Sequence, residues 1–261
     1  MHLSDKNYQK LIHIAIDAGQ IILDIRHNRN LEIDFKQDQS PVTTADYASN
    51  TFIIEALQQH YPDIPIVSEE GVNDVTDMSD LFFLIDPLDG TRDFIEGTQD
   101  YCVNIALLQN YKPILGVIYI PERHTCFYAC HNQGSFKIPN CDDLSKQEKI
   151  SVKSISKHKT QTISKRSSAN GYQFFKMPIT ITDTIHAGSA IKFCQIAEGL
   201  ADIYPRPGNT GEWDTAAGDV IVTEAGGFVG DIHHQPLVYG KSKKNYLNDA
   251  FYAANCILSS E

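Results

Sequence analysis

Two aspartates at the end of an apolar run form the most suggestive chemical group in the sequence. The segment FLIDPLDGTRDF covers residues 83–94, and its apolar start gives way to Asp86 and, three positions later, Asp89. Pro87 disfavours a helical conformation at Asp86, so we expect an abrupt turn there. Gly90 follows Asp89 and lets the backbone approach a ligand closely. The stretch therefore predicts a polar binding site where a strand ends.

Three further acids lie where other predicted elements begin or end. Glu69 and Glu70 follow the apolar segment IPIV, residues 64–67, and Asp214 follows Trp213, the only tryptophan of the chain. In open α/β sheets the carboxyl ends of strands form ligand-binding crevices. Each acid also has a purely structural explanation, since Asp214 could cap the helix that follows it and the glutamates could face solvent in a turn. The sequence leaves both explanations open for each acid taken alone.

A divalent metal would explain the acids as a group. Carboxylates brought together repel one another, and one must be protonated unless a cation lies between them. Oxygen ligands suit hard dications, above all Mg²⁺, which completes its coordination shell with water and substrate phosphate. The chain has a net charge of -11, so such a metal would also supply the positive charge that an anionic substrate requires. We therefore predict a Mg²⁺ site that includes Glu69, Asp86, Asp89 and Asp214.

Other motifs with acids or phosphate-binding loops do not fit the sequence. In an EF-hand loop Gly90 would take the sixth position, which would put the apolar Ile85 first. A phosphatase with a nucleophilic aspartate would need the pattern Asp-x-Asp-Gly-Thr, but the spacing here is Asp86-x-x-Asp89, with Pro87 in the nucleophile's place. The sequence contains no GxxxxGK[ST], GxGxxG or GxSxG motif, and its ten histidines form no helical i,i+4 pair for zinc. The net charge of -11 argues against binding to polymeric nucleic acid.

The pattern of apolar residues predicts a mixed α/β fold that would position these acids. No stretch reaches 18 uninterrupted apolar residues, so we expect no membrane span. The start of the chain lacks an export signal, and the six cysteines form no CxxC motif, so we expect reduced thiols and a cytoplasmic location. The expected helices cover residues 11–26, 43–60, 190–204 and 215–227, and the expected strands cover residues 64–70, 81–85, a hairpin at 101–121, its continuation to 138, and a strand and turn at 231–240.

The chain of 261 residues is long enough for one large domain or two small ones. Residues 139–170 are rich in serine and lysine and poor in large apolar side chains, apart from short possible strands. We therefore place a boundary near residue 145. Residues 1–145 would form an N-terminal subdomain with most metal ligands, and residues 146–261 a C-terminal α/β subdomain with Asp214 and the nucleotide-binding residues.

Four separated stretches resemble one known family. They are DQSPVTTAD (38–46), VSEE (67–70), DPLDGTRDF (86–94) and EWDTAAGDVIVTEAGG (212–227), and they are similar to motifs of the inositol monophosphatase superfamily of Mg²⁺-dependent, lithium-sensitive phosphatases. The resemblance covers essentially the whole chain and implies a layered αβαβα sandwich. Residues 188–206 look most like the bacterial 3′(2′),5′-bisphosphate nucleotidases, which convert adenosine 3′,5′-bisphosphate to AMP and phosphate in sulfur metabolism.

The resemblance also implies a role for each matching residue. Asp86 would bridge two of the two or three Mg²⁺ ions, and two metals about 4 Å apart can clamp the attacking and leaving oxygens of a phosphoryl transfer. Relatives often carry a histidine where this chain has Ser168, so its base pocket differs. The implied metal ligands are Glu69, Asp86, the carbonyl of Leu88, Asp89 and Asp214; the implied catalytic residues are Asp46, Glu69 and Thr91; the implied substrate-binding residues are Gly90, Thr91, Gly188, Ser189, Lys192, Arg206 and Asp214.

Two alternative functions remain at this point. An inositol monophosphatase would use the same metals, but its substrate has one phosphate and offers no second anion to Lys192 and Arg206. A sensor that binds nucleotide or metal without turnover would have no need for Asp46, Glu69 and Thr91 together. We expect a small nucleotide bisphosphate as the partner, a monomer or homodimer, and a cytoplasmic protein with or without peripheral attachment at the inner membrane.

Overall fold

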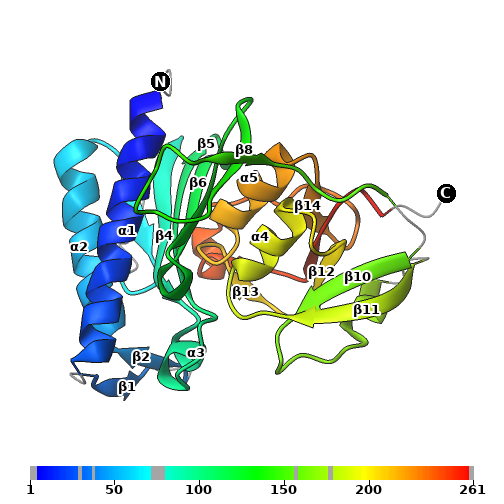
Figure 1. Cartoon of the computed structure of the whole chain (residues 1–261), viewed down its shortest axis with the longest axis horizontal. Helices are drawn as coiled ribbons and strands as arrows, with labels where there is room; N and C mark the ends of the chain where they lie inside the picture. The colour runs from blue at the N-terminus through cyan, green and yellow to red at the C-terminus, as the bar shows by residue number, and fades with distance from the viewer. Residues whose placement is uncertain are drawn as a thin grey trace.

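Helices and sheets alternate in layers across the molecule (Figure 1). The computed structural model describes residues 5–28, 31–36, 39–71, 80–155, 158–175 and 179–258. The first layer is a pair of packed helices, α1 (Asp5–His27) and α2 (Thr44–His60). A seven-stranded sheet follows, then the helices α4 (Ile191–Ala197) and α5 (Ala216–Glu224), and then a five-stranded sheet. The predicted layered α/β class is therefore confirmed.

The seven-stranded sheet carries the first group of acids. Its strand order is β3-β4-β5-β6-β7-β8-β9, with β3 parallel to β4 and every other pair antiparallel. The hairpin expected at 101–121 and its continuation to 138 are confirmed. The strands are β3 (Ile66–Ser68), β4 (Leu81–Asp89), β5 (Cys102–Gln109), β6 (Lys112–Ile120), β7 (Thr125–Cys130), β8 (Gly134–Ile138) and β9 (Glu148–Ile150).

Strand β4 is buried on both faces because helices cover the sheet on both sides. Phe83 and Ile85 pack with the residues of α1 and α2, whereas Phe82 and Leu84 pack with those of α4 and α5. A strand buried on both faces reads as a continuous apolar run instead of an alternating one. The run before Asp86 thus reflects the central position of β4, and it brings the first acid to a fully covered part of the sheet.

The five-stranded sheet completes the C-terminal half. Its order is β11-β10-β12-β16-β14, and α4 and α5 pack against it from the inner side. A short 3-10 helix at Gly171–Phe175 lies against it as an outermost element, where Phe175 contacts Tyr252. The strands are β10 (His158–Ile163), β11 (Thr180–His186), β12 (Ile203–Arg206), β14 (Phe228–Asp231) and β16 (Phe251–Ala254).

Short elements connect these layers. A two-stranded hairpin lies between α1 and α2, a second small pair joins the C-terminal loops, and one short helix follows β4. They are β1 (Ile33–Phe35), β2 (Pro41–Thr43), α3 (Thr91–Ile95), β13 (Thr210–Gly211), β15 (Leu247–Asn248) and 3-10 turns at Pro121–Arg123 and Ser242–Lys244.

Two sequence expectations need correction. The helix expected at 190–204 ends at Ala197, near Gly199, whose residue type already suggested a stop; Gly199 takes a left-handed conformation with φ of +77° and the chain then enters β12. Of the strand and turn expected at 231–240, the turn is confirmed, but the strand is wrong, since β14 ends at Asp231. The Asp231 carboxylate accepts the backbone N–H groups of His233 at 2.8 Å and Gln235 at 2.9 Å, and this closes a turn instead of extending the strand.

The segment 139–170 crosses between the two sheets. It supplies β9 to the seven-stranded sheet and β10 to the five-stranded one. Helix α5, from the C-terminal half, packs on β6 and β7 of the first sheet. The proposed division near residue 145 stays a prediction.

Two other features bear on the chemistry of the chain. All six cysteines lie within the described residues, none of them forms a disulfide, and five are buried. Within the described residues, no helix combines the length and the apolar character that a membrane crossing requires.

Candidate active site

Parallel pairing of β3 with β4 brings the first two acids together. Ser68 lies opposite Ile85 in the register, and the backbone N–H of Glu69 donates to the carbonyl of Ile85 at 3.2 Å. Glu69, directly after β3, therefore lies beside Asp86 of β4. Because both strands run in the same direction, their carboxyl ends reach the same edge of the sheet, as expected for an α/β crevice.

The backbone between Asp86 and Asp89 bulges out of the ladder. Asp86 pairs with Asn104 of β5 and Asp89 pairs with Cys102, so two residues of β4 lie opposite one residue of β5 and the strand holds one extra residue. The N–H of Leu88 donates to Asp86 Oδ1 at 3.0 Å. Asp89 Oδ2 accepts from Asn104 Nδ2 at 3.1 Å and from the backbone N–H of Ala190 at 2.6 Å. The bulge thus aims both carboxylates at one side of the strand.

Asp214 reaches the same place from the start of α5. The sequence left open whether it caps this helix, but the N-cap is Thr215, with no side-chain capping bond. The turn before the helix is anchored by buried Glu212, which accepts the backbone N–H of Gly240 at 2.5 Å and pairs with Lys241 at 2.8 Å. Asp214 therefore does not cap the helix, and one of its carboxylate oxygens lies within 4.8 Å of one oxygen each of Glu69 and Asp86.

These carboxylates form a group that suits a divalent cation. One oxygen from each of Glu69, Asp86 and Asp214 lies within 4.8 Å of the others. Burial, and then repulsion from neighbouring carboxylates, raises the pKa of Asp86 and of Asp214 well above the usual range. Burial also raises the pKa of Asp89, against the lowering effect of Lys192. An all-oxygen donor set with this much uncompensated negative charge fits Mg²⁺.

The remaining catalytic candidates lie beside this group. Thr91 Oγ1 is 3.0 Å from Asp46 Oδ1 and 3.3 Å from the carbonyl oxygen of Leu88. The other oxygen of Asp46 accepts the backbone N–H of Thr43 at 2.8 Å and its hydroxyl at 2.6 Å. Asp46 is therefore the N3 residue of a capping box at α2 as well as the partner of Thr91. Burial raises its pKa, although the bonds from Thr43 and Thr91 oppose the rise.

A lysine that the sequence analysis did not consider enters the acid group. Lys36, directly after β1, places its Nζ 2.8 Å from Glu69 Oε1 and 2.7 Å from Glu70 Oε1. Burial alone would lower the pKa of Lys36, but the two glutamates raise it above its usual value. Glu70 pairs with Lys36 and is not part of the close group of Glu69, Asp86 and Asp214; burial raises its pKa to about 7.

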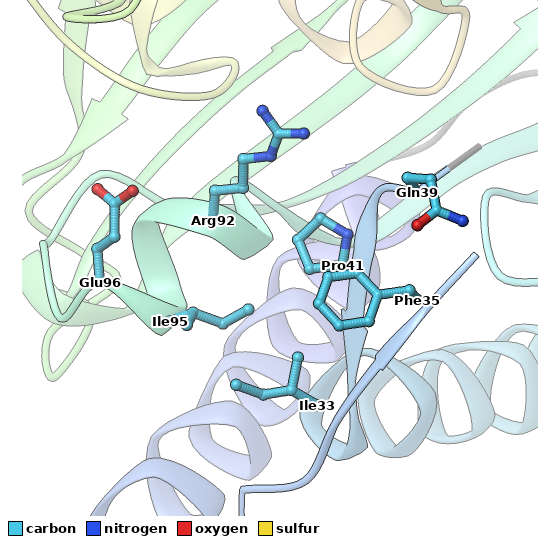
Figure 2. A pocket seen from close by; sticks show the side chains of 7 residues that line it. All are labelled: Ile33, Phe35, Gln39, Pro41, Arg92, Ile95 and Glu96. Carbon is cyan, nitrogen blue, oxygen red and sulfur yellow. The ribbon is translucent and has the colours of Figure 1, made fainter. Parts of the chain in front are cut away.

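A hollow separates the hairpin beside Lys36 from helix α3. Figure 2 shows Ile95 of α3 pointing toward Ile33, Phe35 and Pro41 of the hairpin, while Glu96 points away from them. Together with Gln39, Arg92 and Glu96 they line this hollow of about 260 Å³. Ile33 and Phe35 remain largely exposed at its edge.

A second pocket of about 140 Å³ lies on the other side of Asp89. Gly188 is required there, because a Cβ at this position would lie 2.5 Å from the carbonyl oxygen of Asp100. Arg206 Nε donates to Thr210 Oγ1 at 2.6 Å, which holds the guanidinium in the pocket wall. The lining residues are Asp89, Asp93, Ser164, Gly188, Ser189, Ala190, Lys192, Phe193, Tyr204, Arg206, Thr210 and Asp214.

Lys192 is a buried cation in this pocket. Its Nζ donates to the carbonyl oxygens of Ser189 at 2.6 Å and Ala187 at 3.4 Å, and it lies 5.1 Å from the ring centre of Tyr204. Burial lowers the pKa of Lys192 to about 8, and the charge of Asp89 partly opposes this. Among the described residues no carboxylate forms an ion pair with Lys192, and a buried ammonium in this position favours an incoming anion. The pocket around Lys192 adjoins the group of candidate metal ligands, because Asp89 and Asp214 belong to both.

Comparisons with known proteins decide the family. A family model described as "Inositol monophosphatase family" matches residues 5–257. The chain belongs to the inositol monophosphatase family. It is 35% identical over 246 residues to the "3'(2'),5'-bisphosphate nucleotidase CysQ" of Salmonella typhimurium, covering 93% of this chain and 97% of the relative. The protein of the same name from Buchnera aphidicola is 35% identical over 258 residues, covering 95% of this chain and 94% of the relative.

A solved structure within the inositol monophosphatase family agrees in fold. The crystal structure of CysQ from Bacteroides thetaiotaomicron superposes with a TM-score of 0.80 at 33% identity, covering 96% of this chain and 97% of the other. The predicted family membership is confirmed by these similarities. They cover nearly the whole chain, so the family fold extends through both sheets.

Several residues of this family member could not be found from motifs. Lys36 lies two residues before the DQSPVTTAD stretch, and only the hairpin geometry brings it to Glu69. Asn104 lies in an apolar strand, and no sequence motif points to it. The strand pairing places it opposite Asp86, where its side chain donates to Asp89. Ser168 is exposed in a turn, where its hydroxyl accepts the N–H of Asn170 at 3.2 Å.

Proposed function

We propose that the chain is a Mg²⁺-dependent 3′(2′),5′-bisphosphate nucleotidase that hydrolyses the 3′-phosphate of adenosine 3′,5′-bisphosphate to give AMP and phosphate. The observation that carries the proposal is the placement of the buried Lys192 and of Arg206 in a pocket adjoining the acid group through Asp89 and Asp214. A substrate with two phosphates would use both parts of this site. The relatives that carry this activity in their names cover nearly the whole chain.

The acids are proposed to hold two or three Mg²⁺ ions. Glu69, Asp86, Asp89, Asp214 and the carbonyl of Leu88 would be the ligands. When bound, the metal supplies positive charge and Lewis acidity for the phosphoryl oxygens and the attacking water. Lys36 neutralises part of this negative charge through Glu69 Oε1, and the other oxygen of Glu69 would be available to the metal.

Thr91, Asp46 and Glu69 are proposed to position the attacking water. Thr91 has one hydroxyl proton, and Asp46 Oδ1 at 3.0 Å is its nearer acceptor. This leaves the lone pairs of Thr91 Oγ1 to accept a proton of the water, while a Glu69 oxygen accepts the other. As the water oxygen bonds to phosphorus, the bond from phosphorus to the ribose 3′-oxygen breaks, and no phosphoenzyme forms.

The substrate is proposed to lie across the shared boundary of the two pockets. Backbone N–H groups of Gly90 and Thr91, at the start of α3, would bind oxygens of the 3′-phosphate. Gly188 and Ser189 would contact the nucleotide. Lys192 and Arg206 would bind the second phosphate, which removes the cost of the uncompensated buried ammonium of Lys192.

Phosphate release from three substrates tests the proposal. With Mg²⁺ present, we expect the highest kcat/KM for adenosine 3′,5′-bisphosphate, a lower value for adenosine 3′-monophosphate, and the lowest for inositol 1-phosphate. A preference for inositol 1-phosphate would instead identify an inositol monophosphatase. The proposal that Lys192 and Arg206 bind a second phosphate would then be wrong.

A sensor without turnover is the alternative from another class. The substitution Glu69→Gln distinguishes an enzyme from a sensor, because it removes the carboxylate that would accept a proton while keeping the size of the side chain. For an enzyme we expect binding of AMP in the presence of Mg²⁺ within a few-fold of the wild type and a large loss of kcat. A wild type that binds the nucleotide but releases no phosphate would establish the sensor.

The wider setting of the enzyme is also proposed from the sequence. A cytoplasmic location fits the six free thiols. Inhibition by lithium and a role in sulfur metabolism would follow from the family activity. The monomer or homodimer, the peripheral membrane attachment and the two-subdomain division remain predictions.

A further inference from the structure

Arg166 joins a carboxylate of α3 and that of its C-cap residue from a distant part of the chain. Its Nη1 lies 2.9 Å from Asp93 Oδ2 and its Nη2 lies 2.6 Å from Glu96 Oε2. Arg166 belongs to the turn after β10, where its own N–H donates to Ser164 Oγ at 3.3 Å. Glu96, the C-cap of α3, lies three positions after Asp93, so a single guanidinium can span both.

Asp93 is the important partner because of where it lies. It is buried, with 8% of its surface exposed, and it lines the same pocket as Lys192 and Arg206. Its Oδ2, the oxygen that Arg166 binds, is 3.0 Å from the position that a Cβ would take at Gly188. Asp93 is also close enough to Lys192 to raise the pKa of that amine, against the larger effect of burial. A carboxylate therefore stands at the edge of the proposed second-phosphate position.

An unneutralised carboxylate in that position would oppose a second phosphate. Like charges a few ångströms apart in a recessed site repel strongly, whereas a carboxylate paired with a guanidinium presents little net charge. A free carboxylate would instead be suited to accept hydrogen bonds from neutral hydroxyl groups. Whether the Asp93 carboxylate is paired with a guanidinium or free therefore helps to decide whether the pocket prefers an anion or a polyol.

We propose that Arg166 is a specificity-determining residue, which neutralises Asp93 and so admits the second phosphate of a nucleotide bisphosphate. This inference rests on the proposed function and goes further, because it assigns the discrimination against singly phosphorylated substrates to a pair outside the metal group. The same contact holds the Ser164–Ser167 turn, closed by the bond from Ser167 N–H to the carbonyl of Ser164 at 2.9 Å, at the rim of the pocket. Arg166 acts through Asp93 and is therefore a positioning residue.

The test compares substrates with and without the second phosphate. In Arg166→Gln we expect KM for adenosine 3′,5′-bisphosphate to rise about tenfold, with kcat nearly unchanged, while KM for adenosine 3′-monophosphate changes less than about threefold. Arg92→Gln is the matched control, because Arg92 is an exposed arginine on the same helix. It should leave both KM values at the wild-type level.

A second substitution distinguishes neutralisation from a structural role. Asp93→Asn removes the charge that Arg166 neutralises, so the double variant Arg166→Gln/Asp93→Asn should recover most of the preference for the bisphosphate. An equal loss for both substrates, or a bisphosphate-specific loss that Asp93→Asn does not rescue, would overturn the inference. If the wild type did not prefer the bisphosphate, the proposed function itself would fail. An unchanged preference in Arg166→Gln, beside a wild type that prefers the bisphosphate, would reject only the role of Arg166.

Discussion

One carboxylate oxygen of Asp86 lies within 4.8 Å of one of Asp214, although Asp86 belongs to the central strand β4 and Asp214 precedes a helix of the C-terminal half. They come together because helix α5 packs closely on β6, where Gly116 leaves room for the backbone of Ala217. Two buried carboxylates this close repel each other unless a proton or a cation lies between them. A bound metal ion would supply that positive charge in place of a proton.

Asp214→Asn should abolish most of the activity. The amide keeps the shape of the side chain but removes a negative charge from the proposed ligand group. We expect kcat/KM for adenosine 3′,5′-bisphosphate to fall at least about 100-fold and the Mg²⁺ concentration for half-maximal activity to rise. The control is Asp249→Asn, which changes an exposed aspartate paired only with Lys244 at the surface. Near-normal activity of Asp214→Asn would remove Asp214 from the site.

Lys192→Met should lower kcat/KM selectively for the bisphosphate substrate. Methionine preserves the apolar volume of the buried side chain and removes the charge proposed to meet the second phosphate. We expect kcat/KM to fall at least about tenfold for adenosine 3′,5′-bisphosphate and much less for adenosine 3′-monophosphate. Because burial lowers the pKa of Lys192 to about 8, the wild type should also lose part of its bisphosphate preference above that pH. Equal losses for both substrates would contradict a contact with the second phosphate.

The pH dependence of stability should reveal the buried carboxyl group of Asp219. Burial raises its pKa to about 7, although Tyr239 at 2.8 Å and Thr223 at 3.2 Å donate to it. An acid with a raised pKa binds its proton more tightly in the folded state, so its contribution favours folding at low pH and fades as pH rises from about 4 through about 7. Asp219→Asn should remove this dependence. Relative to wild type, we expect its free energy of unfolding to gain about 1 to 4 kcal/mol between pH 4.5 and 7.5, measured by urea denaturation.

Adding Mg²⁺ should stabilise the protein more at high pH than at low pH. Burial and mutual repulsion raise the pKa values of Asp86 and Asp214, so protons compete with the metal for these carboxylates at low pH. We expect the rise in Tm on adding Mg²⁺ to a chelator-treated sample to be larger at pH 8 than at pH 6. The Asp214→Asn variant should show a smaller rise at both values. A pH-independent rise would place the bound metal elsewhere.

The sequence by itself determined the local geometry of the acid group. The apolar run before Asp86 predicted a buried strand, and Gly90 predicted an unusual backbone, which the structure has at a φ of +98°. These features depend on residues adjacent in the chain, and short-range sterics fix them wherever the chain folds. The separated motifs also predicted the family and its layered fold. The abrupt turn expected at Pro87 is wrong, because β4 continues through Pro87 to Asp89 and the irregularity there is a bulge within the strand.

Only the tertiary structure decided which charges meet. Helix capping was an equally good explanation of Asp214 until the turn anchored by Glu212 directed it to Asp86. The pairing of Lys36 with Glu69, and that of Arg166 with Asp93, depend on the path of a hairpin and of a surface turn. Nothing in the local sequence of a basic residue specifies its partner, because ion pairs act through space and their geometry is set by the packing of the layers that carry them.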